Sequence, residues 1–432
     1  MGKWIRKAEV GGLVFGLAIA VTLLFLPAAA VGEGLLSHHR KDKTEEAPPA
    51  PKPFVKASQA AAFSIPVEPL GFSPPGPYYQ GQRESMASLD FLDEHRLLFT
   101  FHAPGLIHRS ASSQYEERHI RALVLSLPDG AVEAEALWTL HDHERYLWML
   151  GDGHFLLRDL NDLKEGNGAL DLKPLLHFPG PVLWLGMDPG QQFLVTDSDE
   201  PSQAASTAGA GTDTDTQPEV VLRILRRSTG KVMLVSRTRN VVHLPINTEG
   251  YLDALRSTGM SFSLNLNFFS GGSRILGKLD SACVPAIQFL AEQEALANTC
   301  TRDGGRLLVA YSTESGRMWE ALARPEQVWP LLVMAPNGSR VARETLVASH
   351  PVDAFSPLSF DDVLGQLVEV FDAKSGTLVL KVPASPVLDG GGNVAISPSG
   401  RRVAVLEKGA IQVYELPAPA TTPPPATGRT TR

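Results

Sequence analysis

Residues 394–416, VAISPSGRRVAVLEKGAIQVYEL, decide the fold of this chain. Apolar side chains alternate with other residues in 402–406 and again in 410–414, and a period of two is typical of half-buried β-strands. Tight-turn residues separate the runs, at 398–400 (PSG) and at 408–409 (KG). The stretch therefore predicts three short antiparallel strands joined by hairpin turns.

The first of these turns recurs along the chain. The other copies are LDE at 92–94, GDG at 151–153, DPG at 188–190, NTEG at 247–250, AEQ at 291–293 and APNG at 335–338. A second, glycine-containing turn follows downstream of most copies: PDG at 128–130, STG at 228–230, ESG at 314–316 and KSG at 374–376, with glycines at 166, 168, 271 and 272 in the remaining places. Each unit then consists of strand A, a turn, strand B, a loop, strand C, a turn and strand D. Four-stranded units repeated every ~40–60 residues are the pattern of a β-propeller.

Several of these motifs resemble those of the WD40-like and YVTN-type bacterial propellers. DPG at 188–190 and SPSG at 397–400 resemble the Ser-Pro-Asp-Gly turn of that family, and FDAKSG at 371–376 resembles its C-to-D hairpin. The resemblance covers residues 85–416 and implies a propeller architecture. The chain has no Trp-Asp dipeptide and no regular Gly-His pair, so it departs from true WD40 repeats.

We therefore expect an all-β fold, a seven-bladed β-propeller of four-stranded antiparallel blades, with six to eight blades allowed by the count. The last unit ends without a fourth strand. The unclaimed apolar segment 63–67 (FSIPV) could supply that strand, and closure by an N-terminal strand would leave no open sheet edge. Residues 286–299 suit a helix by propensity, but their place in the repeat predicts strands.

The N-terminus predicts where the protein resides. A short basic segment precedes an uncharged apolar run at 11–26, and small residues follow at 28–30. This order is that of a secretory signal peptide, although the 22 uncharged residues from 10 to 31 would also suffice for an uncleaved membrane anchor. Both interpretations place the rest of the chain outside the cytoplasm, either periplasmic or secreted, or anchored to the membrane.

Composition divides the rest of the chain. We expect residues 1–31 to be the signal peptide or anchor, 32–62 a charged and Pro-rich flexible linker, 63–416 the propeller, and 417–432 a disordered Pro/Thr-rich tail. The net charge of −8 excludes the broad basic surface that a nucleic-acid-binding protein needs.

Three units carry extra sequence, at 103–118, 199–219 and 348–365, each between the assigned strands B and C. Strand alternation places all three on one face of the ring, and insertions on one face often mark the binding side of a repeat protein. Surface loops also tolerate insertion without any function, and the Ala/Ser/Thr/Gly-rich middle insertion favours that interpretation. The candidate binding residues of this face are His108, Arg109, Tyr115, His141, His143, His350, Phe355 and Phe360.

The two cysteines predict a disulfide between Cys283 and Cys300. A hairpin turn near residue 292 places position 283 opposite about 301, and an even pair outside the cytoplasm favours oxidation. The alternative is a pair of buried free thiols.

No catalytic or cofactor motif is present in the sequence. The His141-Asp142-His143-Glu144 cluster resembles a metal site, but nothing local completes a ligand set, and a solvated connection between blades is the favoured interpretation. Five tryptophans, at 138, 148, 184, 319 and 329, are expected to pack between blades.

The chain therefore predicts an exported or membrane-tethered monomeric propeller that binds a protein or peptide of the cell envelope, without cofactor, metal or catalytic residues. It would touch the membrane only through its N-terminal segment. The alternative is an envelope enzyme, for example a carbohydrate-active one, with its site at the mouth of the central channel. A convergence of acidic and basic groups at that mouth would discriminate between the two, because propellers serve both kinds of function.

Overall fold

In the computed structural model, the described residues are 55–76, 79–103, 117–141, 144–200, 219–353 and 356–420. The chain divides into two units, Met1–Lys52 and Pro53–Arg432, and every described residue belongs to the second unit. Within the described residues no helix has the length and apolarity to span a membrane. The segment 1–31, predicted as a signal peptide or anchor, lies outside them.

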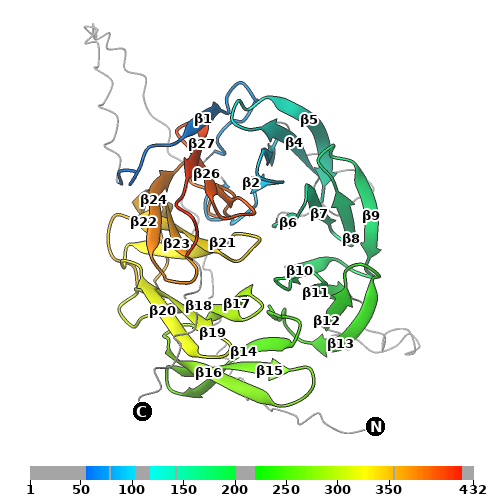
Figure 1. Cartoon of the computed structure of the whole chain (residues 1–432), viewed down its shortest axis with the longest axis vertical. Helices are drawn as coiled ribbons and strands as arrows, with labels where there is room; N and C mark the ends of the chain where they lie inside the picture. Colours follow the sequence, from blue (N-terminus) through cyan, green and yellow to red (C-terminus); the bar gives the residue numbers. More distant parts are fainter. Residues whose placement is uncertain are drawn as a thin grey trace, which may run out of the picture. The chain divides into compact units, whose positions relative to one another are not determined.

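Seven antiparallel sheets surround a centre and form a seven-bladed β-propeller, as the repeat predicts (Figure 1). The innermost A strands are β2 (Ala87–Phe91), β6 (Leu147–Gly151), β10 (Val182–Met187), β17 (Ala286–Ala291), β21 (Gln327–Met334) and β25 (Val394–Ile396). The B strands are β3 (Arg96–His102), β7 (His154–Asp159), β11 (Phe193–Glu200), β14 (Gly250–Thr258), β18 (Glu294–Cys300), β22 (Arg340–Ala348) and β26 (Arg402–Glu407). The C strands are β4 (Arg118–Ser126), β8 (Asp162–Gly166), β12 (Glu219–Arg226), β15 (Ser261–Phe268), β19 (Arg306–Ser312), β23 (Val363–Asp372) and β27 (Ala410–Glu415).

The outer D strands are β5 (Val132–Leu140), β9 (Leu172–His177), β13 (Lys231–Thr238), β16 (Ser273–Asp280), β20 (Gly316–Leu322), β24 (Leu378–Ala384) and β1 (Phe63–Pro66). A short 3₁₀ helix, η3 (Phe360–Asp362), lies in the loop before β23. All seven A–B turns fall where the recurring turn motif predicts them. Residues 286–299 form β17 and β18, so their position in the repeat overrides their helix propensity.

The fourth blade differs from the others because its A strand is irregular. Its described sheet has three strands, β14 to β16. The segment 241–246 takes the innermost place through a single bridge from Ile246 to Tyr251 and a hydrogen bond of 3.0 Å from the Leu252 amide to the Pro245 carbonyl. Pro245 itself cannot donate a backbone hydrogen bond, which explains why regular pairing fails here.

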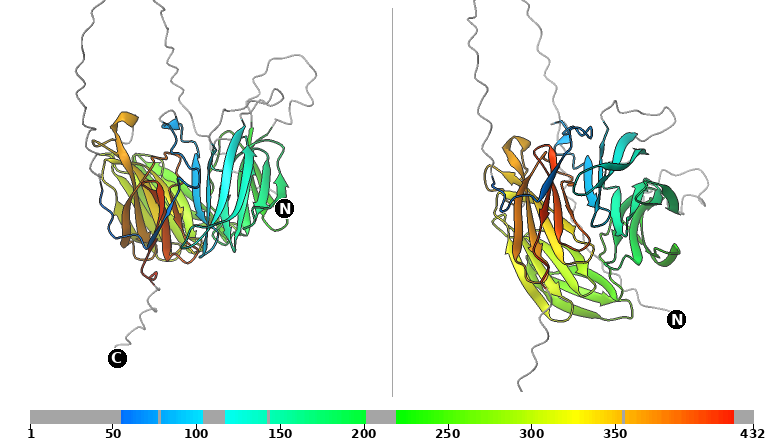
Figure 2. Two further views of the ribbon diagram at one scale, coloured as in Figure 1. Left: turned by 90° about the horizontal axis from the view of Figure 1, so that it is seen from above. Right: turned by 45° about the horizontal axis from the view of Figure 1, so that its top comes forward.

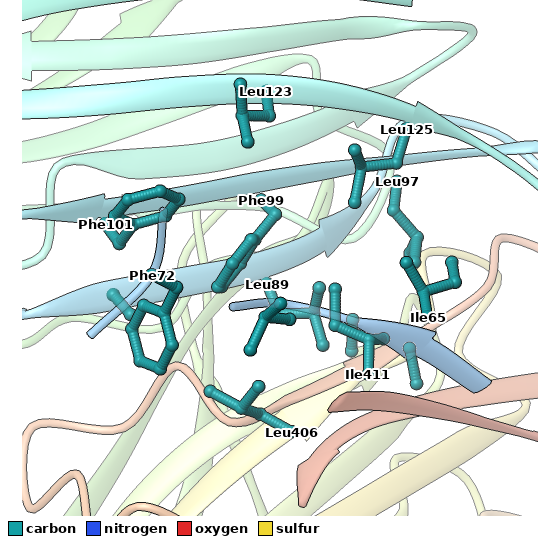
Figure 3. Packing of buried hydrophobic residues seen from close by; sticks show 14 of the residues in the cluster. Ile65, Phe72, Leu89, Leu97, Phe99, Phe101, Leu123, Leu125, Leu406 and Ile411 are labelled. Carbon is teal, nitrogen blue, oxygen red and sulfur yellow. The ribbon is translucent and has the colours of Figure 1, made fainter. Parts of the chain in front are cut away.

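The ring closes through the N-terminal strand, as predicted. β1 pairs antiparallel with β27 in the register Phe63 with Val413 and Ile65 with Ile411, which completes the order β1-β27-β26-β25. The closure is apolar as well as hydrogen-bonded, because Ile65 packs among buried residues of the first and last blades (Figure 3). This blade 7–blade 1 cluster has 18 buried members and is the largest of the interblade clusters.

Each of the seven blade junctions has its own apolar cluster among the described residues. Among the described residues, the junction between blades 3 and 4 has the smallest cluster, formed by Val195, Leu222, Ile224 and Ile246. Buried apolar area is the main source of stability between blades, so this junction is the weakest part of the ring by packing.

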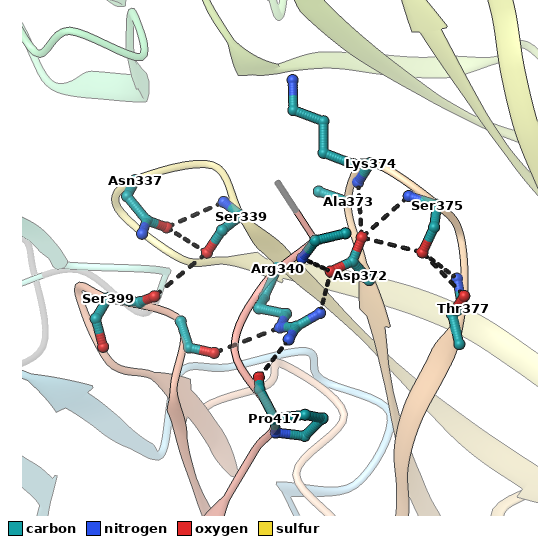
Figure 4. A network of polar contacts seen from close by, with 12 residues as sticks. Asn337, Ser339, Arg340, Asp372, Ala373, Lys374, Ser375, Thr377, Ser399 and Pro417 are labelled. Carbon is teal, nitrogen blue, oxygen red and sulfur yellow. Dashed lines mark hydrogen bonds and ion pairs between the residues drawn. The ribbon is translucent and has the colours of Figure 1, made fainter. Parts of the chain in front are cut away.

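A buried polar network joins the turns of blades 6 and 7 on the face opposite the long loops (Figure 4). Arg340, which is 1% exposed, forms an ion pair with Asp372 and donates a hydrogen bond of 2.7 Å to the Pro417 carbonyl. Asp372 also accepts the Ala420 amide at 2.9 Å. The first residues of the predicted tail, 417–420, are therefore tied to blade 6. At the other end, the Ser58 amide donates to the Lys381 carbonyl, so part of the predicted linker also contacts the ring.

Cys283 and Cys300 form the predicted disulfide, with their Cα atoms 5.5 Å apart. The bond links the residues just before β17 to the end of β18. Trp138 and Trp148 are buried at the junctions between blades 1 and 2 and between blades 2 and 3, as expected. Trp319 donates its indole N–H to the Ala373 carbonyl of the next blade at 2.6 Å.

Candidate functional site

The B–C loops and the D–A connections open on one face of the ring, because neighbouring strands alternate in direction. We call this the long-loop face. The described ends of the strands that flank the three predicted insertions lie on it, at the connections from β3 to β4, from β11 to β12 and from β22 to β23; most of the first two insertions lies outside the described residues. The third insertion is described for 348–353 and 356–363, so its contacts can be followed. It rises from the same face as the segment that leads into β2 (Figure 2, left).

Three side chains meet on this face and form what we call the aromatic–arginine cluster. The ring centroids of Trp329 and Phe360 lie 5.8 Å apart and are tilted by 58°. The Arg83 guanidinium carbon lies 5.0 Å from the centroid of the Trp329 ring, a cation–π geometry. Arg83 is exposed and both rings are half-buried, so the cluster presents apolar surface next to a positive charge.

Trp329 reaches this position through an irregularity in β21. The pairing of β21 with β22 shifts between Val328 and Leu331, and Trp329 has a φ of 49°. A left-handed backbone is rare for a bulky residue, and such strain is most often retained at functional sites. Because of this bulge, the indole lies against Phe360 and not in the position that regular strand pairing would give it.

Asp389, in the connection from blade 6 to blade 7, holds the arginine side of the cluster. Its Oδ2 accepts the Gly81 amide at 2.9 Å and the Arg83 amide at 3.0 Å. Gly81 has a φ of 86°, and a β-carbon at that position would lie 3.2 Å from the Phe360 ring. Glycine is therefore required both by the backbone and by the close approach of the aromatic side chain.

The loop of blade 6 rests on an apolar floor. Val328, Leu346 and Ala348 are buried beneath it, together with Val352 of the loop itself. The Val352 amide also donates to the Pro325 carbonyl, in the preceding D–A connection, at 3.2 Å. The buried apolar side chains and this hydrogen bond both hold the loop, so the aromatic–arginine cluster is ordered before any partner binds.

A buried carboxyl group lies behind this surface. Glu344 on β22 is 1% exposed, and neither of its carboxyl oxygens has a hydrogen-bond partner among the described residues. It lies opposite Leu331 in the sheet, and a β-carbon on Gly391 would be 3.6 Å from its Oε2. Burial raises the pKa of Glu344 from 4.5 to about 8, so the group is mostly protonated at neutral pH.

A second polar group lies at the junction between blades 3 and 4. Trp184 on β10 stacks on His243 with 5.1 Å between the ring centroids. Asp197 is fully buried, and its Oδ2 accepts the Val242 amide at 2.8 Å, which fixes the irregular inner segment of blade 4. Burial raises the pKa of Asp197 to about 6. Burial also lowers the pKa of His243, against the opposing charge of Glu144.

Blade 1 contributes an acid on its innermost strand, and the connection into blade 2 contributes a base. Asp90 on β2 accepts the Ser88 hydroxyl at 2.5 Å, and burial raises its pKa. Arg145 lies just before β6, with its guanidinium 5.3 Å from the centroid of the Trp148 ring. Burial lowers the pKa of Arg145, and the charge of Asp90 acts in the opposite direction. The charges of Asp90 and Arg145 therefore interact between blades 1 and 2.

The structure describes three of the predicted binding residues. Phe360 is part of the aromatic–arginine cluster. His350 is exposed in the same loop, and its Nδ1 lies 3.2 Å from the Ser349 hydroxyl. His141 lies on a D–A connection and pairs with Asp159 at 3.0 Å. The other predicted residues, His108, Arg109, Tyr115, His143 and Phe355, lie outside the described residues.

Sequence reasoning does not find Arg83, Asp389 or the role of Trp329. Arg83 lies in a connection before the first blade, outside the three insertions, and Trp329 is expected from the sequence to pack between blades. A Gly-Gln-Arg stretch (81–83) offers no periodic pattern, so no local signal marks it. Within the described part of the chain, no group of three or more His, Cys, Asp or Glu side chains is arranged to hold a metal ion.

No model of a known protein family matches the chain, and no curated protein matches it in sequence. Solved structures with a similar arrangement of strands include the acylaminoacyl peptidase of Pyrococcus horikoshii, at 8% identity over 77% of this chain and 52% of the peptidase, with a TM-score of 0.46. The chain therefore spans about half the length of that enzyme.

Two further similar structures are much smaller. Sqt1 from Chaetomium thermophilum is 11% identical over 76% of this chain and 96% of its own, with a TM-score of 0.39. Hsv2 of Kluyveromyces lactis is 15% identical over 61% of this chain and 71% of its own, with a TM-score of 0.34. At these identities the likeness concerns the arrangement of strands alone and assigns no activity or partner to this chain.

Proposed function

We propose that this protein is an extracytoplasmic binding module that captures a protein or peptide on its long-loop face. The aromatic–arginine cluster is the observation that carries the proposal. Aromatic and arginine side chains are the residues most enriched among those that dominate binding energy. Here the two rings are half-buried above an apolar floor and Arg83 is exposed beside them, with a bulge holding Trp329 and Asp389 holding the backbone of Arg83.

Preorganisation supports this role. A surface that is already ordered loses less conformational entropy on binding than a mobile loop does. The cluster joins three chain segments that are far apart in sequence, at residues 79–84, 328–331 and 356–363. A partner that inserted an apolar side chain beside Trp329 and a carboxylate beside Arg83 would match both features.

The proposed location rests on two features of the chain. The basic, apolar and small-residue order of residues 1–31 is that of an export signal or anchor. The Cys283–Cys300 disulfide is the kind of bond that persists in oxidising compartments. An alkaline phosphatase fused after residue 60 should therefore be active. An inactive fusion, with the protein recovered from the cytosol, contradicts this location.

The binding face is tested with immobilised full-length mature protein and an extract of the cell envelope. Partners retained by the wild type are identified and then offered to variants. Arg83→Glu and Phe360→Ala should reduce retention at least about tenfold, the equivalent of 1.4 kcal/mol. Arg401→Ala, on an A–B turn of the opposite face, is the matched control and should retain the partner. Equal retention by all three variants would place the binding surface elsewhere.

The alternative function is catalysis at the inner side of blades 1 to 4. The observation that favours it is that Asp90, Arg145 and His243 all have shifted pKa values, the last two beside tryptophans, since shifted titratable groups cluster at active sites. Hydrolysis of envelope polysaccharides by the wild type, abolished in His243→Ala and retained in Arg83→Glu, would support the enzyme. If neither the wild type nor Arg83→Glu hydrolyses these polysaccharides, this catalytic function is contradicted.

A further inference from the structure

The outer strand of blade 3, β13, exposes four consecutive apolar side chains to solvent. In β13, Val232, Met233, Leu234 and Val235 are exposed by 44, 51, 41 and 55%. Successive residues of a strand point to opposite faces of the sheet, so neither face of β13 is covered by a neighbouring blade. The other described outer strands expose at most two large apolar side chains each, such as Ile275 on β16 and Leu322 on β20.

The edge of this strand is also open. β13 ends the sheet order β10-β11-β12-β13, so one side of its backbone has no strand partner within the sheet. Proteins commonly protect such edges with charged residues or proline inside the strand. The middle of β13, residues 232–235, has neither, and the charged residues Lys231 and Arg237 stand only toward its ends.

The charge around β13 is opposite to that of the whole protein. Residues 219–239 contain six basic side chains and one acidic one, whereas the chain carries a net charge of −8. Arg237 is paired with Glu219 at 2.7 Å, and Arg223 is paired with Glu200. Lys231 and Arg239 are exposed on either side of the apolar run. A ligand for this edge should therefore be apolar in the middle and acidic at both ends.

We propose that β13 accepts an extended segment of a partner protein as a fifth strand of blade 3, and that this segment has an apolar centre and acidic flanks. Backbone hydrogen bonds would provide affinity, and the alternate side chains and flanking carboxylates would provide specificity. The surface lies on the outer edge of the ring and is distinct from the long-loop face.

Two other occupants fit less well. A second copy of this chain, paired antiparallel about a two-fold axis, would bring Lys231 of one copy near Arg237 of the other, and like charges across a sheet are destabilising. A membrane surface would suit the apolar side chains but would leave the backbone N–H and C=O groups of the edge without partners, which is costly in lipid.

The test uses the full-length mature protein and a fluorescent synthetic peptide, EEVTVTVEE, with binding followed by anisotropy. The acidic peptide should bind and should protect the amides of residues 231–238 from hydrogen exchange. A peptide with alternate amides N-methylated, and the basic version KKVTVTVKK, should each bind at least about tenfold more weakly. Equal binding of the N-methylated peptide would overturn the proposal, because strand pairing would not be involved.

Variants locate the site on the protein. Met233→Glu and Val235→Glu should abolish binding of the acidic peptide. Ile275→Glu, at a position of 66% exposure on the outer strand β16, makes the same charge change on the neighbouring blade and should bind normally.

Failure of the peptide to bind the wild type overturns the proposal. So does a wild-type dimer in sedimentation that the β13 variants lose, or stronger binding to phosphatidylserine vesicles than to the peptide. None of these outcomes depends on the long-loop face.

Discussion

Cys283 and Cys300 join the start of blade 5 to the end of its second strand, with a sequence separation of 17 and 5.5 Å between the Cα atoms. Loops of this length contribute about 3 kcal/mol in the chain-entropy model of disulfide stability. The Cys283→Ser, Cys300→Ser double variant should therefore melt several degrees below the wild type under non-reducing conditions. Thiol labelling of the denatured, unreduced wild type should find no free thiol, and two labelled cysteines would contradict the bond.

Closure of the ring depends on the inward side of β1. Ile65 is 3% exposed within the blade 7–blade 1 cluster, whereas its neighbour Ser64 is exposed on the same strand. Ile65→Ala should destabilise the protein by about 2–5 kcal/mol, the usual range for a truncated core isoleucine. Ser64→Ala retains the strand and should be within about 0.5 kcal/mol of the wild type. Chemical denaturation measures both, and similar stabilities would show that β1 does not lock the ring.

Glu344 predicts a pH dependence of stability. The folded protein holds its proton more tightly than the unfolded chain does, because the pKa is raised from 4.5 to about 8. The free energy of unfolding therefore falls as pH rises across that window. Glu344→Gln should remove this loss, which is of the order of 3 kcal/mol at pH 7. Its melting temperature should exceed that of the wild type more at pH 8 than at pH 5. Glu133→Gln, exposed on β5, is the control and should show no such trend.

Asp389 should control the order of the aromatic–arginine cluster. Asp389→Ala removes the acceptor for the amides of Gly81 and Arg83, so these two amides should exchange with solvent faster. Amides of the central strands should keep their protection, because the apolar floor is unchanged. Unchanged exchange at residues 79–84 would mean that packing on Phe360 alone holds the segment.

The junction between blades 3 and 4 should open first under mild destabilisation. Of the junctions, it buries the fewest apolar side chains among the residues that the structure describes, and the inner segment 241–246 has one bridge where the other blades have a strand. Hydrogen exchange in low denaturant should release the amides of 241–252 before those of β26 and β27. Release of the blade 7–blade 1 junction first would contradict this order.

The repeat could be predicted from the sequence because turn chemistry is local. Glycine at positive φ, as at Gly130 and Gly376, marks many of the hairpins without reference to the rest of the fold. The disulfide follows from the same register. Segment 241–246 also has the apolar alternation of an inner strand, but Pro245 and the contact with Asp197 decide its shape, and that contact forms only when blade 3 packs against blade 4.

The candidate site was less predictable because its parts are distant in the chain. Phe360 lies in an insertion, which is visible in a single sequence. Trp329 and Arg83 are about 250 residues apart and meet only after the ring has formed. The bulge that exposes Trp329 depends on the pairing of β21 with β22, which no local pattern marks.

Pairing of β1 with β27 also means that the ring can close only after β27 has been synthesised. The strand at 63–66 leaves the ribosome first among the blades, yet its partner at 410–415 is about 350 residues later, which at usual rates of synthesis is a delay of roughly 20–70 s. Any chain that stops short of residue 410 lacks the strand that receives β1 and keeps two unpaired edges. Unpaired strand edges pair readily with other chains, so a chain that stops there should be more prone to aggregation and proteolysis than one that includes β27.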